Sequence, residues 1–230
     1  MESEKKNEIF KYIKFAIMIF IRPQYTMTRV VKNPNWIFPL LLIILFNATY
    51  SLLIYDIKTI DRINELKNIE IHTPISELRN NTIPKYFLLV ANSINIFMGL
   101  FLFSFIIHFI CNTILQGKAR FKSIFAMMTW TSLVSVIELI IKYIIILNKG
   151  STKGVTLSLA LISPGLIKSD NLSWLYIILS SLSLQVIWQG TLLIFGLSIL
   201  YRFSKKRALF IIVLLWIIWA IFIYVISFLS

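Results

Sequence analysis

Two ionisable side chains stand inside a long apolar run of the sequence. Glu138 and Lys142 lie four residues apart, which places them on one face of a helix with the acid before the base, the order that favours pairing. A charge at the centre of a membrane helix costs roughly 2.5–3.5 kcal/mol, so such residues are retained for a reason. The pair is either an ion pair that fixes helix packing or a relay for protons or cations. We predict the packing pair.

A second apolar run carries His108 and Cys111 three residues apart, with Ser104 and Asn112 near the same helix face. Two ligands do not make a metal site, because protein sites for transition metals use three or four. No second histidine and no carboxylate in this run completes the set. We therefore predict a histidine at a helix contact, with no metal and no cofactor.

Amide side chains at helical spacing add to this polar set. In lipid, such residues turn inward to hydrogen-bond other helices, or they line a groove for a polar substrate or a lipid headgroup. We predict contacts between helices, with the second and fourth apolar runs at the centre of the bundle. The candidate intramembrane polar site comprises Glu138, Lys142, His108, Asn92, Asn95, Gln185 and Gln189.

The composition identifies the class of protein. Hydrophobic residues make up 58% of the 230 residues and charged residues only 14%, against about 25% charged in ordinary globular domains. The basic residues that give the net charge of +13 lie between the apolar runs, and this distribution excludes a soluble nucleic-acid-binding domain. The sequence has no HExxH, GxSxG, P-loop or dinucleotide-binding glycine motif. We predict an integral membrane protein without catalytic residues.

Five apolar runs are long enough to cross a bilayer, which takes about 20 residues in a helix. The fold class predicted is all-α, with residues 36–230 forming a five-helix transmembrane domain after a cytoplasmic segment, 1–35. The second and fourth runs exceed the bilayer thickness, so they must tilt or kink, with Gly99 and the Gln189–Gly190 pair as kink points. The predicted spans are about 36–55, 86–115, 124–147, 173–201 and 208–229.

The apolar stretch 9–21 is too short to cross and carries lysines on one side, so we predict a helix lying in the membrane surface. The alternative, a signal peptide, lacks a small-residue cleavage site and is followed by Arg22-Pro23. Basic side chains next to the spans predict contacts with anionic lipid. The predicted contacts are Lys5, Lys6, Lys11, Lys14, Lys205, Lys206 and Arg207.

The distribution of Lys and Arg predicts the orientation. More than half of the 23 basic residues lie in the first 35 residues and in the loops 116–123 and 202–207. The alternate segments, 56–85 and 148–172, hold fewer basic residues, partly offset by acids. The positive-inside rule places the N-terminus in the cytoplasm and Ser230 outside. Alternating apolar and charged residues from Ile57 to Ile69 predict a short amphipathic helix on the outer surface.

Three stretches together resemble one family. They are RPQYTMTRVVKNPNW before the first span, LQGKARFKSIFA at the second inner loop, and the glycine-bearing WQGTLLIFGLSILYRFSKKRALF. In order and spacing they resemble the bacterial branch of the YIP family, the Ypt/Rab-GTPase-interacting membrane proteins, from about residue 20 to 226. The resemblance implies five helices and a cytoplasmic N-terminus.

The family's eukaryotic members work in vesicle traffic with small GTPases, but this sequence lacks their acidic-aromatic motif before the first span. Bacterial relatives include accessory proteins of ABC-type exporters and of envelope-stress defence. We therefore expect a non-catalytic scaffold or accessory factor in the bacterial cytoplasmic membrane, with the bilayer, an ABC-type exporter or a second copy as partners and no nucleic acid. The alternative is a transporter or channel for a small solute, lipid or ion.

Overall fold

The structure is a computed structural model that describes residues 2–68, 84–162 and 174–229, and every regular element in these ranges is a helix. Within these ranges, four stretches are long and apolar enough to cross a membrane, and they overlap the first four predicted spans. The fifth predicted span falls on a single helix of 25 residues, α10 (Lys205–Leu229), and its crossing remains a prediction. The four stretches are Ile37–Glu65, Lys85–Ile114, Phe121–Lys149 and Leu184–Tyr201.

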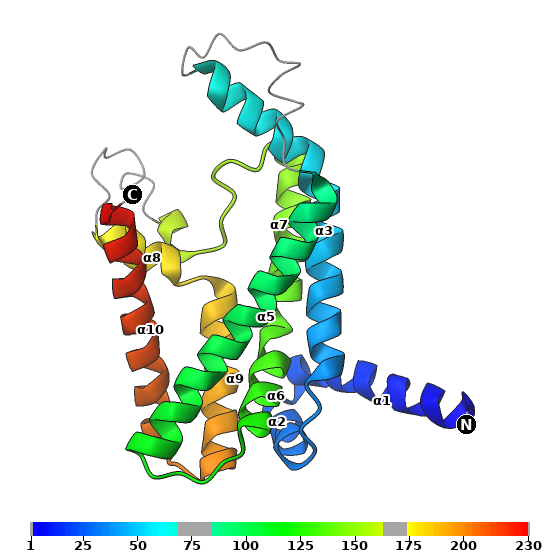
Figure 1. Cartoon of the computed structure of the whole chain (residues 1–230), viewed down its shortest axis with the longest axis vertical. Coiled ribbons are helices and arrows are strands. Elements are labelled where there is room, and N and C mark those ends of the chain that lie inside the picture. The colour runs from blue at the N-terminus through cyan, green and yellow to red at the C-terminus, as the bar shows by residue number, and fades with distance from the viewer. Residues whose placement is uncertain (1, 69–83, 163–173, 230) are drawn as a thin grey trace.

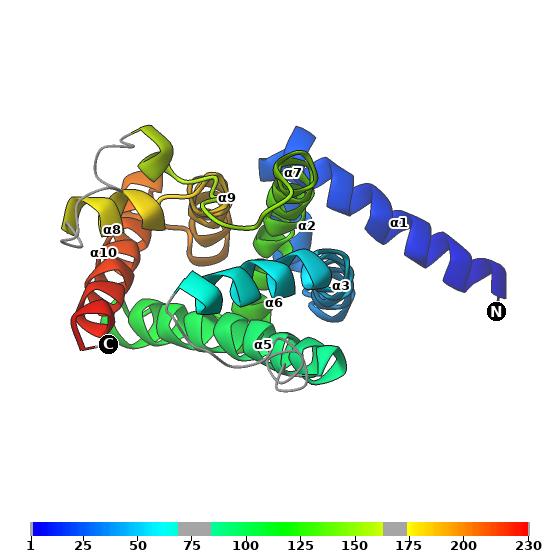
Figure 2. The same ribbon diagram turned by 90° about the horizontal axis from the view of Figure 1, so that it is seen from above.

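The N-terminal helix α1 (Glu2–Ile21) projects sideways from the bundle in both ribbon views (Figures 1 and 2). Its second half is docked, because Ile19 is fully buried and the Tyr12 ring stacks on Phe38 at 5.1 Å between centroids. Ile13 and Ile17, by contrast, are about half exposed. The predicted surface helix is therefore also part of the bundle at its C-terminal end.

The short helix α2 (Pro23–Lys32) begins at a proline, which suits the first helical position because it needs no N–H partner there. It ends before Asn33-Pro34, since proline disfavours helical backbone in the preceding residue. The Asn35 side chain then caps the next helix, accepting a hydrogen bond from the Ile37 N–H at 3.1 Å. These local signals place α2 under the bundle, against α6 and α9.

Helix α3 (Ile37–Asn68) continues well beyond the predicted first span. The predicted outer amphipathic helix is therefore, as far as Asn68, the end of α3 rather than a separate element. In Figure 1 this cyan end leans away from the lower part of the helix. The last residue of the predicted helix, Ile69, lies outside the described residues.

The third predicted span forms α6 (Phe121–Ser132) and α7 (Val134–Lys149), joined at Leu133. Every residue from Ser123 to Val134 is buried, so α6 is the centre of the bundle. The expectation that the second and fourth spans form the centre is wrong. Their composition misleads because bulky apolar residues on α5 (Lys85–Phe109) face outward, such as Phe105 at 50% exposure.

Trp130 anchors α6 to the chain below it. Its side chain is 2% exposed, and its indole Nε1 donates to the Asn35 carbonyl oxygen at 2.7 Å. Three aromatic rings surround the indole, those of Tyr12, Phe15 and Phe38. A buried indole that has both its N–H and its ring faces engaged fixes the positions of α1, α3 and α6 relative to one another.

The fourth predicted span is not one helix. It divides into α8 (Trp174–Ser181) and α9 (Leu184–Tyr201), and the break falls at Leu182–Ser183 rather than at Gln189–Gly190. The second span is likewise helical through Gly99, and its irregular part is the π-helical turn η1 (Ile110–Ile114). The 3-10 turn η2 (Leu159–Ile162) packs against α8.

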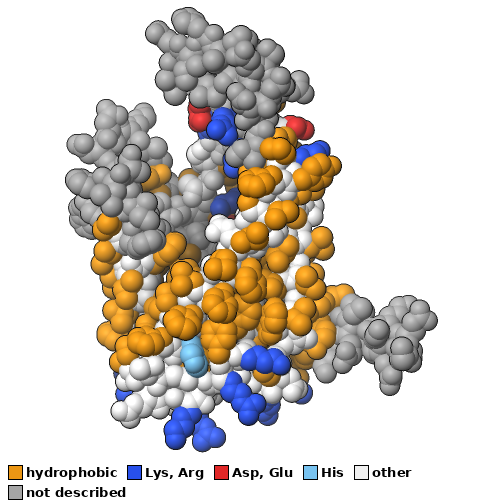
Figure 3. Space-filling view, in the orientation of Figure 1, with side chains coloured by type: hydrophobic (Ala, Val, Ile, Leu, Met, Phe, Trp, Pro, Cys, Tyr) orange, Lys and Arg blue, Asp and Glu red, His pale blue; other side chains and the backbone are white. Residues whose placement is uncertain are grey.

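Basic side chains gather at one end of the bundle. Figure 3 shows apolar side chains over the middle of one face and blue Lys and Arg side chains gathered at the lower end. That end carries the loops before α6 and α10, where exposed basic residues include Lys118, Lys122 and Lys206. The wide apolar belt is the surface expected of helices that face lipid.

Candidate functional site

The ion pair predicted between Glu138 and Lys142 is present. Lys142 Nζ lies 2.7 Å from Glu138 Oε1, and the acid's side chain is 6% exposed while that of the base is 28% exposed. The two residues occupy successive turns of α7, as their spacing requires. Because the Lys142 side chain is partly exposed, its flexible alkyl chain can extend the amine out of the bundle.

The second carboxylate oxygen of Glu138 is also engaged. Glu138 Oε2 accepts a hydrogen bond from the backbone N–H of Gln185, at 3.0 Å. Gln185 lies in the first turn of α9, where backbone N–H groups have no partner within the helix. Ser183 satisfies a neighbouring group, because its Oγ accepts from the Val186 N–H. Glu138 and Ser183 together cap α9, and the negative charge suits the helix dipole there.

The break between α8 and α9 places that helix end beside Glu138. The loop that follows α7 pairs with this break. The Leu184 N–H donates to the Leu157 carbonyl oxygen, and the Leu159 N–H donates to the Leu182 carbonyl oxygen. These bonds replace the helical bonds lost at the break. The result is a helix terminus inside the bundle with its polar groups satisfied.

His108 and Cys111 make separate contacts within the bundle. The His108 ring packs edge-on against Phe121 at 5.7 Å, and its Nδ1 is buried without a hydrogen-bond partner in the described part of the chain. Cys111 is fully buried. Among the described residues, no group of three or more His, Cys, Asp or Glu could hold a metal ion.

The π-helical turn η1, which follows α5, takes part in a hydrogen-bond network that fixes the inner loop, residues 116–123. Asn112 Oδ1 accepts a hydrogen bond from the Tyr201 hydroxyl at 2.6 Å, and its Nδ2 donates to the Ala119 carbonyl. Gly117 fits beneath the Tyr201 ring, where a Cβ atom would clash. Asn112 therefore joins η1, the inner loop and α9, a role that its spacing from His108 does not reveal.

The four amides of the candidate site go to different places. Asn92 Nδ2 donates to Ser51 Oγ at 3.4 Å, a contact from α5 to α3. Asn95, Gln185 and Gln189 line a cavity instead. Gln189 Nε2 donates to Ser132 Oγ at 2.7 Å, which joins α9 to α6. The prediction of contacts between helices therefore holds for Asn92 and Gln189.

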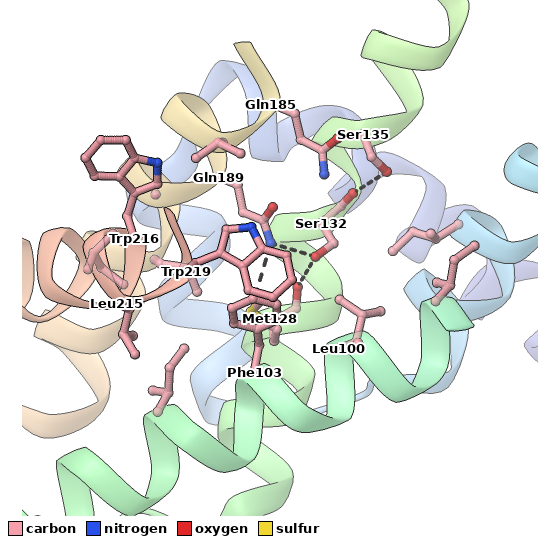
Figure 4. A pocket seen from close by; sticks show the side chains of 18 of the residues that line it. Leu100, Phe103, Met128, Ser132, Ser135, Gln185, Gln189, Leu215, Trp216 and Trp219 are labelled. Atoms are coloured by element: carbon pink, nitrogen blue, oxygen red, sulfur yellow. Dashed lines mark hydrogen bonds between the residues drawn. The ribbon is translucent and has the colours of Figure 1, made fainter. Parts of the chain in front are cut away.

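The cavity lies between α3, α5, α6, α7, α9 and α10 and has a volume of about 430 Å³. Figure 4 shows Gln185, Gln189, Ser132 and Ser135 on one side of it and the rings of Phe103, Trp216 and Trp219 around the rest. Neither Glu138 nor His108 lines it. No charged side chain is among the described residues that line it, so its walls are mainly apolar with a few amide and hydroxyl groups.

The predicted lipid contacts are exposed where the structure describes their side chains. Lys14, Lys205, Lys206 and Arg207 are exposed, and Lys205 Nζ lies 5.3 Å from the centre of the Phe195 ring. The side chains of Lys5, Lys6 and Lys11 lie outside the described part of α1. Lys205, Lys206 and Arg207 form the exposed first turn of α10, where Lys205 and Arg207 also lie over aromatic rings.

An outer polar cluster was not predicted from the sequence. Asp61 near the end of α3 accepts hydrogen bonds from Ser151 Oγ at 2.8 Å and from the Thr152 backbone N–H at 2.6 Å and its Oγ1 at 2.7 Å. Asp61 is 8% exposed. No sequence spacing indicates this contact, because its partners are about ninety residues away.

These features define a helical integral membrane protein in which some interior polar groups link helices and others hydrogen-bond within their own helix. A family model, the Yip1 domain, matches residues 17–227, and the chain therefore belongs to the Yip1 domain family. Proteins of this family are generally non-catalytic membrane proteins. Neither a curated protein nor a solved structure matches the chain.

Proposed function

We propose that this Yip1-domain protein acts without catalysis, as a scaffold or accessory factor for other membrane proteins. The observation that carries the proposal is the state of Glu138, the acid within the central spans. Both of its carboxylate oxygens are engaged, one by Lys142 and one by the first turn of α9. An acid held in this way serves packing and is poorly placed to pass protons or cations along a path.

The proposed partners are the bilayer and a membrane protein such as an ABC-type exporter, or a second copy of the chain. Large apolar side chains are exposed along α5 and α10, including Phe105 at 50% and Phe210 at 68%. Helix surfaces of this kind contact lipid or another transmembrane helix. The role proposed on these grounds is associated with an exporter or with envelope defence.

We place the protein in a bacterial cytoplasmic membrane with five spans, the N-terminus inside and Ser230 outside. The exposed basic residues at one end of the bundle support this orientation, since Lys and Arg near span ends favour the cytoplasmic side. Helix α10 supports the fifth span, because its 25 residues would extend about 37 Å. Its exposed bases, Lys205, Lys206 and Arg207, would then meet anionic lipid.

Purification from native membranes in mild detergent tests the scaffold role. A photo-cross-linking amino acid at Phe105 or Phe210 would report on the two exposed faces, with Phe125, which is 5% exposed, as the buried control position. We expect a second membrane protein to co-purify in stoichiometric amount and to cross-link from an exposed position but not from Phe125. Purification of the chain alone, with no protein cross-link at either exposed position, would contradict the scaffold role.

The second candidate function is a carrier or channel for a small solute, lipid or ion. The cavity lined by Gln185, Gln189 and Asn95 favours it. The absence of Glu138 and His108 from that lining weakens it for ions. Uptake of a labelled ion or solute by liposomes that contain the purified chain, above that of empty liposomes, would favour the carrier.

A further inference from the structure

We infer that the cavity is a binding site for one uncharged amphiphilic lipid, such as an acylglycerol, whose acceptor oxygen receives a hydrogen bond from the Trp216 indole. The inference does not depend on the scaffold role, since a bound lipid is compatible with a scaffold or a carrier. Four features of the cavity carry it: an unpaired donor, uncharged walls, depth within the bilayer and volume.

The unpaired donor is Trp216 Nε1. It is buried and has no hydrogen-bond partner in the described ranges of the chain. Buried indole N–H groups usually have a hydrogen-bond partner, because a buried donor without one has lost its hydrogen bond to water. Figure 4 shows the nitrogen on the side of the ring turned toward the other lining residues. Because an indole nitrogen only donates, the missing partner must be an acceptor, such as an ester carbonyl or a hydroxyl oxygen.

The other polar groups suit the same kind of molecule. Gln189 uses its amide nitrogen to hold Ser132, which leaves its amide oxygen as an acceptor for a hydroxyl group. Ser132 Oγ in turn donates to the Met128 carbonyl. A glycerol ester with a free hydroxyl has both an acceptor for Trp216 and a donor for Gln189.

The walls disfavour a charged ligand. None of the described residues that line the cavity is charged, and the neighbouring Glu138–Lys142 pair is satisfied by its own partners. An ionised phosphate or carboxylate in this place would be buried without a counter-charge, at a cost of several kcal/mol. The bound part of the ligand is therefore neutral.

The depth of the cavity points the same way. Trp216 lies nine residues beyond the basic Arg207 on α10, or about 14 Å along the helix axis. A phospholipid that kept its headgroup at that surface would hold its ester groups near the surface as well. A neutral lipid is free to lie deeper, with its polar end at Trp216 and its chain along Phe103 and Leu215.

The volume of the cavity suits a small ligand. The cavity measures about 430 Å³, and pockets for small ligands measure about 300–1,000 Å³. The cavity is therefore large enough to hold much of a small lipid.

The test uses the full chain in nanodiscs with a photoactivatable monoacylglycerol that carries a diazirine in its chain. Gly99 lies in the cavity wall, and a Cβ atom built there meets nothing within 4 Å, so we expect Gly99→Leu to place its side chain in the cavity. Ala91→Leu is the matched control, because Ala91 is exposed on the same helix outside the cavity. We expect Gly99→Leu to lower saturable labelling at least fivefold and Ala91→Leu to leave it unchanged.

A second pair of variants tests the hydrogen bond. Trp216→Phe keeps an aromatic ring and removes the donor, so we expect binding of the monoacylglycerol to weaken about 3- to 10-fold. Trp188→Phe is the control, because Trp188 is 41% exposed on α9 and does not line the cavity. Equal labelling of Gly99→Leu and wild type, or no change in Trp216→Phe, would overturn the assignment. Equal labelling by an anionic phosphatidylglycerol probe would overturn the requirement for a neutral ligand.

Discussion

Glu138 on α7 caps α9: its Oε2 accepts a hydrogen bond from the backbone N–H of Gln185 at 3.0 Å. The same carboxylate pairs with Lys142 through its other oxygen, at 2.7 Å. One side chain therefore satisfies a helix terminus inside the bundle and neutralises a neighbouring charge. Its cost of burial is offset by both contacts.

The cap predicts a difference between two substitutions of Glu138. Glu138→Gln keeps an oxygen that can accept from Gln185 N–H, whereas Glu138→Ala removes both the cap and the partner of Lys142. Loss of a helix cap alone costs about 0.5–2 kcal/mol. We expect Glu138→Ala to lower the thermal unfolding midpoint in detergent more than Glu138→Gln does. Equal midpoints for the two variants would contradict the capping role.

Helices α9 and α6 approach each other closely at Gly196, and this contact predicts the effect of a substitution there. A Cβ atom at this position would clash with Met127 Sδ and lie 2.8 Å from Met127 Cγ. Met127 is fully buried and cannot move aside into solvent. We expect Gly196→Ala to destabilise the fold by about 1–3 kcal/mol, the usual cost of overpacking. The measurement is unfolding of the purified protein in mixed micelles.

Gly99→Ala is the control for this substitution. Gly99 is also a helix-interior glycine, but nothing lies within 4 Å of a Cβ atom there. Alanine is the better helix former by about 1 kcal/mol, so this variant should be neutral or slightly more stable than wild type. If both glycine variants lose stability equally, the cause is not the contact with Met127.

Much of the bundle could be predicted from the sequence, because membrane spans follow from length and hydropathy alone. The pair Glu138 and Lys142 could also be predicted, since both residues lie on one helix at a fixed spacing. The contact of Glu138 with Gln185 could not, because it depends on the break at Leu182–Ser183. That break has no proline or glycine to mark it, and hydrogen bonds from the loop near Ser158 stabilise it.

Which helix forms the buried centre could not be predicted from the sequence either. In a membrane, apolar residues face both lipid and neighbouring helices, so hydropathy does not separate an inner helix from an outer one. Helix α6 carries small and polar residues that the bundle buries, such as Thr129 and Thr131, both fully buried. Their hydroxyls donate to carbonyl oxygens of their own helix, which makes burial inexpensive.

Asp61 joins the end of α3 to the loop after α7 through its hydrogen bonds with Ser151 and Thr152, a contact that we call the clasp and expect to stabilise the loop. Asp61→Asn would replace one acceptor oxygen by an NH₂ group that faces donors from Thr152 or Ser151. Hydrogen bonds to a charged group are worth about 1.5–3 kcal/mol. We expect faster tryptic cleavage in this loop, at Lys149 and Lys153, measured by gel densitometry on the protein in nanodiscs.

The matched control for the clasp is Glu65→Gln. Glu65 lies one helical turn beyond Asp61 and pairs with Lys153 at 3.2 Å, but its side chain is 58% exposed. An exposed ion pair contributes about 0–1 kcal/mol. Cleavage of this variant should match wild type. Equal acceleration by both substitutions would show that loop charge, rather than the buried clasp, controls cleavage.

The proposed orientation predicts the labelling of single cysteines in intact cells. Cys111 is fully buried, so the native chain should react with no impermeant thiol reagent and serves as the blank. A cysteine at Lys153 in the outer loop should react from outside, and one at Ser204, an exposed residue before α10, only after the cells are permeabilised. The reverse pattern would show that the orientation is wrong.

The central claim is that polar groups inside the bundle serve packing between helices rather than transport. The most direct test compares wild type with Glu138→Gln and with the double variant Glu138→Gln/Lys142→Met, by the membrane level of folded protein and by complementation of a deletion strain. Because removing both charges also removes their desolvation cost, the double variant should accumulate and complement like wild type, whereas Glu138→Gln alone should show a mild folding defect, limited because Lys142 reaches outward. A double variant that is fully folded in the membrane but inactive would contradict the claim.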